Sequence, residues 1–168
     1  MIGVGASRAY KRALEGHKQV TLMIGAVLFS VLAVAGPSEA RAAATPEVET
    51  CLAKASALHQ VDLRILKAVA KVESDMNPKA VNHNSNGTGD TGMMQINDWW
   101  LPTLARFGIK KQDLFDACTS AYVGAWILAH EIQKHGMTWR AIGAYNSPNE
   151  ANQQIYAQKV ANALATIP

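Results

Sequence analysis

The 168-residue sequence contains little of what several kinds of functional site require. It has two cysteines and five histidines. The histidines stand singly, at no ligand spacing with the cysteines or the acids, so the pattern does not indicate a metal site. The sequence also has no glycine-rich phosphate-binding loop, no internal repeat and no linker between two units. We therefore expect one domain that uses neither a metal nor a cofactor.

Positive charge is also scarce once the first residues are set aside. The chain has 16 basic and 13 acidic side chains, for a net charge of +3. Residues 1–42 hold five of these bases and two of these acids, which leaves 11 of each in the remainder. Because the remainder is neutral and has no basic run, we do not expect a nucleic-acid partner.

The first 42 residues have the pattern of a secretory signal peptide. Basic residues precede an apolar stretch at 20–35, and a run of small residues follows it. We expect cleavage after Ala42 or Ala44, a mature domain at 43–168, and a periplasmic location. The alternative is an uncleaved anchor helix, since about 17 apolar residues is the lower limit for spanning a bilayer. We expect membrane contact only through this segment.

Cys51 and Cys118 form an even count in a chain that is expected to be exported, which predicts one disulfide. Closing a loop of about 67 residues would stabilise the fold by roughly 4 kcal/mol, because it restricts the unfolded chain. The alternative is two unrelated buried thiols.

The spacing of apolar residues predicts a mainly α-helical domain of about six helices. The second of these is expected at 63–74. We expect the helices to begin at capping residues, which are Thr45, Asp62, Asp116 or Thr119, Thr138 and Asn149. Apolar residues expected to face the core include Leu58, Trp126, Trp139 and Ile155.

Residues 77–90 interrupt the helical pattern. They are rich in Asn, Gly, Ser, Thr and Asp, which predicts a loop with at most a short hairpin. A further helix is expected from Met93 to Phe107, bent or divided at Pro102. Of the neighbouring Trp99 and Trp100 only one is expected in the core, because adjacent residues on a helix do not face the same way.

Glu73 lies on an apolar helix face together with Leu66, Val69 and Ala70. Burial disfavours the charged form of a carboxyl group, so its pKa rises and it can stay protonated near neutral pH, as a general acid requires. Helical spacing alone does not show that Glu73 is catalytic, because a glutamate at a helix end is more often a surface residue. The amides of Gln95 and Asn97 favour a catalytic role, since they suit sugar hydroxyl and N-acetyl groups.

Glu73, Gln95 and Asn97 belong to a longer series of motifs. In chain order these are Val72-Glu73-Ser74, Asn77-Pro78, Asn86-Gly87, Asp90, Gly92-Met93-Met94-Gln95-Ile96-Asn97, Cys118, Ala144-Tyr145-Asn146 and Tyr156. In these motifs and in their order the sequence resembles the lytic transglycosylases with a lysozyme-like domain. The resemblance is to the small exported members that accompany type III and type IV secretion, conjugation and pilus systems. It covers roughly residues 50–160 and implies that 43–168 forms a single lysozyme-like transglycosylase domain.

The resemblance implies that Glu73 is the sole catalytic acid and base. Ser74 would help to orient Glu73 or the substrate, Met94 would lie against a sugar face, and Tyr145 would lie near Glu73. The substrate-binding residues implied are Ser74, Met94, Gln95, Asn97, Tyr145, Asn146 and Tyr156. The sequence departs from the family pattern at Met93, at Ser120 and at Ser147-Pro148, and the last departure leaves the shape of the groove edge open.

The implied reaction cleaves the β-1,4 bond between N-acetylmuramyl and N-acetylglucosamine residues of peptidoglycan and leaves 1,6-anhydromuramyl ends. It would open the cell wall locally for a secretion, conjugation or pilus apparatus. One alternative is a hydrolytic muramidase in which Asp75 or Asp90 positions a water. We expect Asp75 to be a solvated or capping residue and Asp90 to structure its loop. The other alternative is a non-catalytic wall-binding assembly factor.

Overall fold

The structure, a computed structural model, describes residues 45–168, and the expected signal segment at 1–42 lies outside them. As predicted, this part of the chain is mainly helical. Its elements in order are α1 (Pro46–His59), α2 (Leu63–Ser74), β1 (Val81–His83), β2 (Gly89–Thr91), β3 (Ile96–Asn97), η2 (Asp98–Trp100), α3 (Leu101–Ala105), η3 (Lys111–Phe115), α4 (Ala117–His135), α5 (Trp139–Asn146) and α6 (Glu150–Leu164). Within 45–168 no helix has the length and apolar character needed to cross a membrane.

The predicted capping residues begin five of the helices. The side chain of Asp62 accepts hydrogen bonds from the backbone N–H groups of Arg64 and Ile65, at 2.8 and 3.1 Å. At the start of α4 the cap is Asp116 rather than Thr119, and it accepts from the Thr119 N–H at 2.8 Å. These bonds satisfy donors that have no partner inside the helix. Thr45, Thr138 and Asn149 cap α1, α5 and α6 in the same way.

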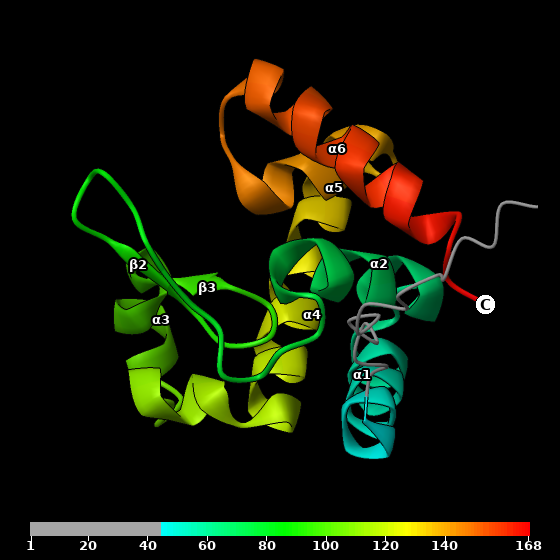
Figure 1. Cartoon of the computed structure of the whole chain (residues 1–168). Coiled ribbons are helices and arrows are strands. Elements are labelled where there is room, and N and C mark those ends of the chain that lie inside the picture. Colours follow the sequence, from blue (N-terminus) through cyan, green and yellow to red (C-terminus); the bar gives the residue numbers. More distant parts are fainter. Residues whose placement is uncertain (1–44) are drawn as a thin grey trace, which may run out of the picture. The chain divides into compact units, whose positions relative to one another are not determined.

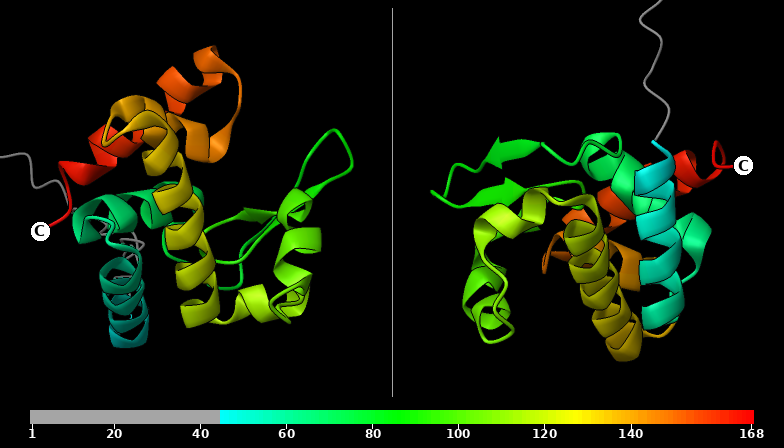
Figure 2. Two further views of the ribbon diagram at one scale, coloured as in Figure 1. Left: turned by 180° about the vertical axis from the view of Figure 1, so that it is seen from behind. Right: turned by 90° about the horizontal axis from the view of Figure 1, so that it is seen from below.

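Helix α4 packs against α1 on one side and against α5 on another, while α6 packs against α5 and α2 (Figures 1 and 2). The predicted disulfide joins α1 to the start of α4, between Cys51 and Cys118. The core between the helices includes Leu52, Leu66 and Leu128, all fully buried. This packing fixes the C-terminal end of α2, where Glu73 lies, against α6.

The polar segment after α2 folds into a three-stranded antiparallel sheet in the order β1-β2-β3. The predicted short hairpin is present as β1 and β2, and β3 extends it. In the register of the sheet Asp90 of β2 lies between Asn82 of β1 and Asn97 of β3. The sheet therefore places three polar side chains, from three separate stretches of sequence, in one row.

The helix predicted from Met93 to Phe107 is wrong in its first part. Gly92 and Gln95 have positive φ angles of 80° and 47°, so the chain turns there before it enters β3. A side chain at Gly92 would meet the backbone oxygen of Leu114 at 2.0 Å, which makes glycine necessary. Pro102 lies in the first turn of the short α3, a position that proline tolerates, and so it marks the start of a helix rather than a bend.

Several apolar residues predicted for the core are exposed, namely Leu58, Trp139 and Ile155. In α6 the neighbouring Tyr156 and Val160 point inward, and Ile155 is turned away from them by the 100° step between adjacent helical residues. Trp126 is partly buried against the core, as is Trp100, whereas Trp99 is exposed. The prediction that only one of the two adjacent tryptophans is a core residue is thus confirmed.

Candidate active site

Glu73 lies in the last turn of α2, which ends at Asp75 in a left-handed conformation. The neighbouring Ser74 hydroxyl donates to the backbone oxygen of Met93 at 2.7 Å and accepts from the Asn77 N–H at 3.0 Å. Ser74 therefore ties the end of α2 to the turn at 92–95. Both of its hydrogen bonds are to backbone groups, and it does not line the cleft described below. Ser74 therefore positions Glu73 through the backbone of this turn.

Hydrogen bonds to two helices hold the backbone of Met94 in this turn. Its N–H donates to the Ser120 hydroxyl at 3.1 Å, and its backbone oxygen accepts from the Tyr145 hydroxyl at 2.8 Å. Its side chain has no exposed surface and packs against Gly124 of α4, where an added side-chain atom would lie 2.7 Å from it. The prediction that Met94 lies against a sugar face is therefore wrong, because the side chain is a core residue.

The carboxyl group of Glu73 is partly buried and faces α6. The Tyr156 hydroxyl donates a hydrogen bond to Glu73 Oε1 at 2.5 Å. The Tyr156 ring in turn stacks on that of Tyr145, with ring centroids 6.4 Å apart. Two tyrosines from different helices thus surround the carboxyl group on the α5–α6 side.

The pKa of Glu73 is raised from 4.5 to about 7, above all because burial disfavours the charged carboxylate. The negative charge of Asp90 raises it further. Two groups act in the opposite direction: the hydrogen bond from Tyr156 and the positive charge of Lys159 both favour the carboxylate. With a pKa near 7, Glu73 can both donate and accept a proton at physiological pH, as an acid–base catalyst must.

A cleft of about 480 Å³ opens in front of Glu73. It lies between the sheet on one side and α5 with the start of α6 on the other. Among the predicted site residues Gln95, Asn97, Tyr145 and Asn146 line it together with Glu73. The remaining lining residues are Asn84, Ser85, Asn86, Asp90, Ile96, Trp100, Ile127, Ser147 and Asn152. A smaller pocket of about 270 Å³ adjoins the same carboxyl group, and Tyr156 lines that one.

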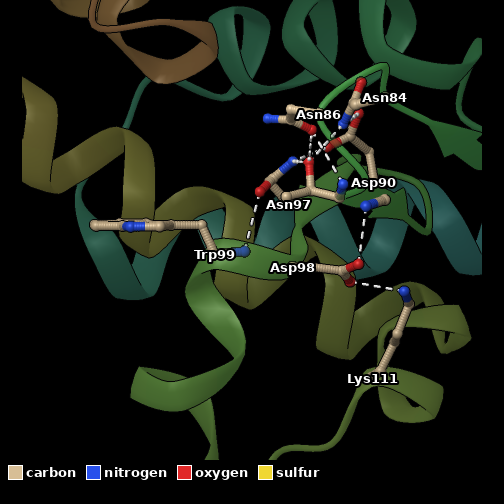
Figure 3. Close-up of polar contacts among 9 residues, drawn as sticks. Asn84, Asn86, Asp90, Asn97, Asp98, Trp99 and Lys111 are labelled. Carbon is tan, nitrogen blue, oxygen red and sulfur yellow. Dashed lines mark hydrogen bonds and ion pairs between the residues drawn. The ribbon is translucent and has the colours of Figure 1, made fainter.

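Asp90 is the centre of a polar network on the sheet side of the cleft, shown in Figure 3. One carboxylate oxygen accepts from the side-chain amides of Asn82 and Asn84 at 3.1 and 3.0 Å, and the other accepts from Asn97 at 2.7 Å. Asn97 also donates to the Thr88 hydroxyl at 3.1 Å. Asp90 thus holds the three strands together while it faces the cleft.

A second anchor, also visible in Figure 3, lies where the loop of the β1–β2 hairpin enters β2. The Asp98 carboxylate accepts from the Gly89 N–H at 2.8 Å and forms an ion pair with Lys111 at 2.7 Å. The bond with Lys111 is the main reason that the pKa of Asp98 lies below its ordinary value. Asp90 and Asp98 therefore both hold the loop-side half of the hairpin against β3 and η2, which keeps the sheet side of the cleft in place.

Three of the six amide-bearing residues of the cleft were not predicted as site residues. Asn84, Asn86 and Asn152 line it, and Trp100 adds an aromatic surface. Asn82, Asn84 and Asn86 alternate along the chain, so a strand or hairpin would present them on the same side. That spacing is the signal that was available in the sequence. Among residues 45–168 no group of three or more His, Cys, Asp and Glu side chains is arranged to hold a metal ion.

The functional groups of the site are a protonatable carboxyl group and, beside it, a cleft lined with amides and two aromatic side chains. Amides bind sugar hydroxyl and N-acetyl groups through paired donors and acceptors, and a carboxyl group with a pKa near 7 suits protonation of a glycosidic oxygen. Fold and site together define the class of enzymes that cleave polysaccharide chains by acid–base catalysis.

Comparison with known proteins identifies the family. The Transglycosylase SLT domain matches residues 50–165. The chain is 39% identical over 115 residues to the "Invasion protein IagB" of Salmonella typhi, covering 66% of this chain and 72% of the relative. It is 36% identical over 115 residues to "Protein IpgF" of Shigella flexneri, covering 66% and 76%. The "Peptidoglycan-binding-like protein" of Escherichia coli O157:H7 is 31% identical over 122 residues, covering 66% and 73%.

A solved structure shares the fold. It is that of an inactive mutant of the lytic transglycosylase Slt from Pseudomonas aeruginosa, with a TM-score of 0.57 and 20% sequence identity. The match covers 70% of this chain and 23% of that one, so the matched part corresponds to less than a quarter of the larger protein. The chain therefore belongs to the transglycosylase SLT family, the peptidoglycan lytic transglycosylases, and has their lysozyme-like fold.

Proposed function

We propose that this protein cleaves the β-1,4 bond between N-acetylmuramyl and N-acetylglucosamine residues of peptidoglycan and leaves 1,6-anhydromuramyl ends. The observation that carries the proposal is the carboxyl group of Glu73, which has a pKa of about 7 and lies where the amide-lined cleft meets a second pocket. A polymer cleaved within its length must extend on both sides of the acid, and the two pockets provide that space.

In the proposed reaction Glu73 acts twice. It first gives its proton to the glycosidic oxygen, so that the bond to the muramyl C1 breaks and the N-acetyl group of the same sugar stabilises the positive charge at C1. The carboxylate then takes the proton of the muramyl 6-hydroxyl, whose oxygen bonds to C1. No water enters, and Glu73 ends in its starting protonation state. Tyr156 keeps the carboxyl group oriented through both steps.

A hydrolytic muramidase is the second candidate function, and the position of Asp90 in the cleft favours it. Asp90 lines the same cleft and its charge acts on Glu73, so it is placed to position a water. Both oxygens of Asp90 are, however, occupied by amide donors from three asparagines. This structural use of the carboxylate favours transfer within the substrate over hydrolysis.

Peptidoglycan cleavage also suggests where the protein acts. We propose a periplasmic enzyme, exported through residues 1–42, that opens the wall locally for a secretion, conjugation or pilus apparatus. The support is the signal-like pattern of the first residues, the predicted disulfide, and the similarity to a protein named for invasion.

The test is product analysis of purified peptidoglycan after digestion. Mass spectrometry of the wild-type digest is expected to show anhydromuramyl ends, while Glu73→Gln, which still accepts the Tyr156 hydrogen bond, yields no products. Glu47→Gln makes the same change on the exposed side of α1 and is expected to digest like the wild type. Reducing ends in place of anhydro ends would favour the muramidase, and unchanged lysis by Glu73→Gln would exclude the mechanism.

The non-catalytic alternative, a wall-binding assembly factor, makes a different prediction. Such a protein would sediment with peptidoglycan without releasing soluble products, and Glu73→Gln would bind as the wild type does. The wild-type digest alone therefore separates the wall-binding factor from the transglycosylase and from the muramidase.

A further inference from the structure

A separate pocket lies on the side of α6 that faces away from Glu73. It has a volume of about 480 Å³, within the range of ligand-binding pockets. Its walls come from the start of α5 and from α6, two helices that pack against each other (Figure 1). None of its lining residues lines the catalytic cleft or the smaller pocket that adjoins Glu73. We call it the α5–α6 pocket.

Helical spacing explains how α6 can line two different sites. Gln154, Ala157 and Ala161 lie along one side of the helix and line the α5–α6 pocket. Tyr156 and Lys159 line the pocket beside Glu73. They lie on the opposite side of α6, because each residue of a helix is turned by 100° from the one before it. The α5–α6 pocket can therefore be altered without changing the residues around the catalytic carboxyl group.

Trp139 gives the α5–α6 pocket an aromatic wall. It is the first residue of α5, and 49% of its surface is exposed. On the α6 side the pocket adds the small side chains of Ala157 and Ala161. A large aromatic side chain that stays exposed at a pocket is typical of a surface that binds a ligand with an apolar face.

The polar side chains of the α5–α6 pocket are mainly uncharged amides. Gln154 and Gln158 are exposed, while Gln153 is buried. The two charged residues of the lining, Arg140 and Glu150, form an ion pair with each other at 2.8 Å. The lining therefore favours a neutral ligand that combines hydrogen-bonding groups with apolar surface.

A saccharide has this chemistry. The faces of a sugar ring carry C–H groups that pack on an indole ring, and its edges carry hydroxyl and N-acetyl groups that pair with amides. The catalytic cleft combines the same kinds of group, amides with aromatic side chains. A lipid chain would leave three amides without hydrogen-bond partners, and an acidic peptide would meet a cation that already has a partner.

We propose that the α5–α6 pocket is a second glycan-binding site, in which Trp139 packs against a sugar ring while Gln154 and Gln158 bind its hydroxyl and N-acetyl groups. The identity of the ligand rests on the proposed function, because an enzyme that cleaves peptidoglycan works among many copies of the same sugars. A strand held in the pocket keeps the cleft close to further glycan and raises its effective concentration. A short fragment gains nothing from the pocket, since it brings no second segment to the cleft.

The experiment compares insoluble peptidoglycan with short soluble glycan fragments. The ratio kcat/KM is measured on both substrates for wild type, Trp139→Ala and Phe107→Ala. Trp139→Ala is expected to lower kcat/KM on insoluble peptidoglycan about fivefold, the size expected for the loss of one aromatic contact, and to cleave the fragments like the wild type. Phe107→Ala removes an exposed aromatic side chain outside the pocket and should match the wild type on both substrates.

A second variant covers the case in which Trp139→Ala disturbs the fold and loses activity on both substrates. Gln154→Ala/Gln158→Ala changes two exposed side chains and keeps the indole ring. It should also lower kcat/KM on insoluble peptidoglycan alone, again about fivefold, because two hydrogen bonds to the glycan are lost. An equal loss on both substrates in this variant too would mean that the pocket acts only through the fold, and the proposal would be wrong.

Unchanged digestion of insoluble peptidoglycan by Trp139→Ala and by the glutamine variant would overturn the second glycan site and leave the proposed function standing. If the wild type cleaves neither substrate, the proposed function fails, and sedimentation with insoluble peptidoglycan decides about the pocket. Glu73→Gln/Trp139→Ala should then bind about fivefold more weakly than Glu73→Gln, and equal binding by the two would exclude the site.

Discussion

The Tyr156 hydroxyl donates a 2.5 Å hydrogen bond to Oε1 of Glu73, across 83 residues of sequence. The bond joins α6 to the end of α2 and has two effects on the carboxyl group. It fixes the orientation of the group, and it favours the charged form, which partly offsets the rise in pKa caused by burial. Tyr156 therefore sets both the position and the acidity of Glu73.

Tyr156→Phe removes this hydrogen bond and keeps the ring. Because the bond lowers the pKa of Glu73, its loss should raise that pKa above about 7. We expect the alkaline limb of the pH profile of kcat/KM to move to higher pH, and kcat/KM at pH 5 to fall roughly tenfold because the carboxyl group is less well oriented. Tyr122→Phe in α4 is the matched control. A profile that keeps its wild-type alkaline limb would contradict the tuning role.

Asp90→Asn should act in the opposite direction. The charge of Asp90 raises the pKa of Glu73, so its removal should move the alkaline limb to lower pH. The neutral side chain also brings an amide N–H against the asparagine donors that now surround the carboxylate, and the melting temperature should fall. The pH profile, measured beside that of Tyr156→Phe, checks the sign: shifts of both variants in one direction would show that the electrostatic account is wrong.

Gly92→Ala tests the turn that carries Met94. The position combines a φ of 80° with a backbone oxygen 2.0 Å from where a side chain would begin. We expect a loss of about 3 kcal/mol or more in the free energy of unfolding. Gly87 has a similar φ of 85° but nothing within 4 Å, so Gly87→Ala should cost only about 1 kcal/mol. Urea unfolding of the pair measures the difference, and equal losses would mean that the close approach at Gly92 is relieved by movement.

Local signals in the sequence predicted the helices well. Asp62 and Asp116 are followed by apolar residues at helical spacing, and the hydrogen bonds that define such caps involve only the next two or three residues. The position of Glu73 on a buried face was predictable for the same reason, since helical periodicity alone places it beside Leu66 and Val69.

What the sequence did not reveal depends on contacts between distant segments. The turn at Gly92 is required by the approach of Leu114, and no local pattern reports that contact. Met94 was predicted to lie against a sugar face, and its packing against Gly124 of α4 makes it a core residue instead. The roles of Asn84 and Asn86 depend on the register of the hairpin, which an Asn- and Gly-rich segment specifies only weakly.

The disulfide gives a further prediction. It joins two helices across 67 residues of sequence, so its loss should release a large loop in the unfolded chain. The double variant Cys51→Ser/Cys118→Ser is expected to lose up to about 4 kcal/mol in the free energy of unfolding. Wild-type protein unfolded with a reductant should show the same loss. If neither treatment changes the unfolding midpoint, the bridge does not form in the protein.

Glu73→Gln should stabilise the fold, by an amount that depends on pH. The folded protein holds the Glu73 proton up to a pH of about 7, while the unfolded chain releases it near 4.5. Between these values the folded state binds more protons than the unfolded state, so the wild type loses stability as the pH rises. Glutamine does not titrate, and its amide oxygen still accepts from Tyr156.

The two proteins should therefore have the same stability near pH 4, and at pH 8 the variant should be more stable by about 3 kcal/mol. Urea unfolding at pH 4, 6 and 8 measures the difference, with Glu47→Gln expected to follow the wild type throughout. A constant offset between Glu73→Gln and wild type would mean that Glu73 is charged in the folded protein at neutral pH and cannot act as the acid. A gain that grows between pH 4 and 8 is the expected consequence of a carboxyl group whose pKa is raised by burial in the folded protein.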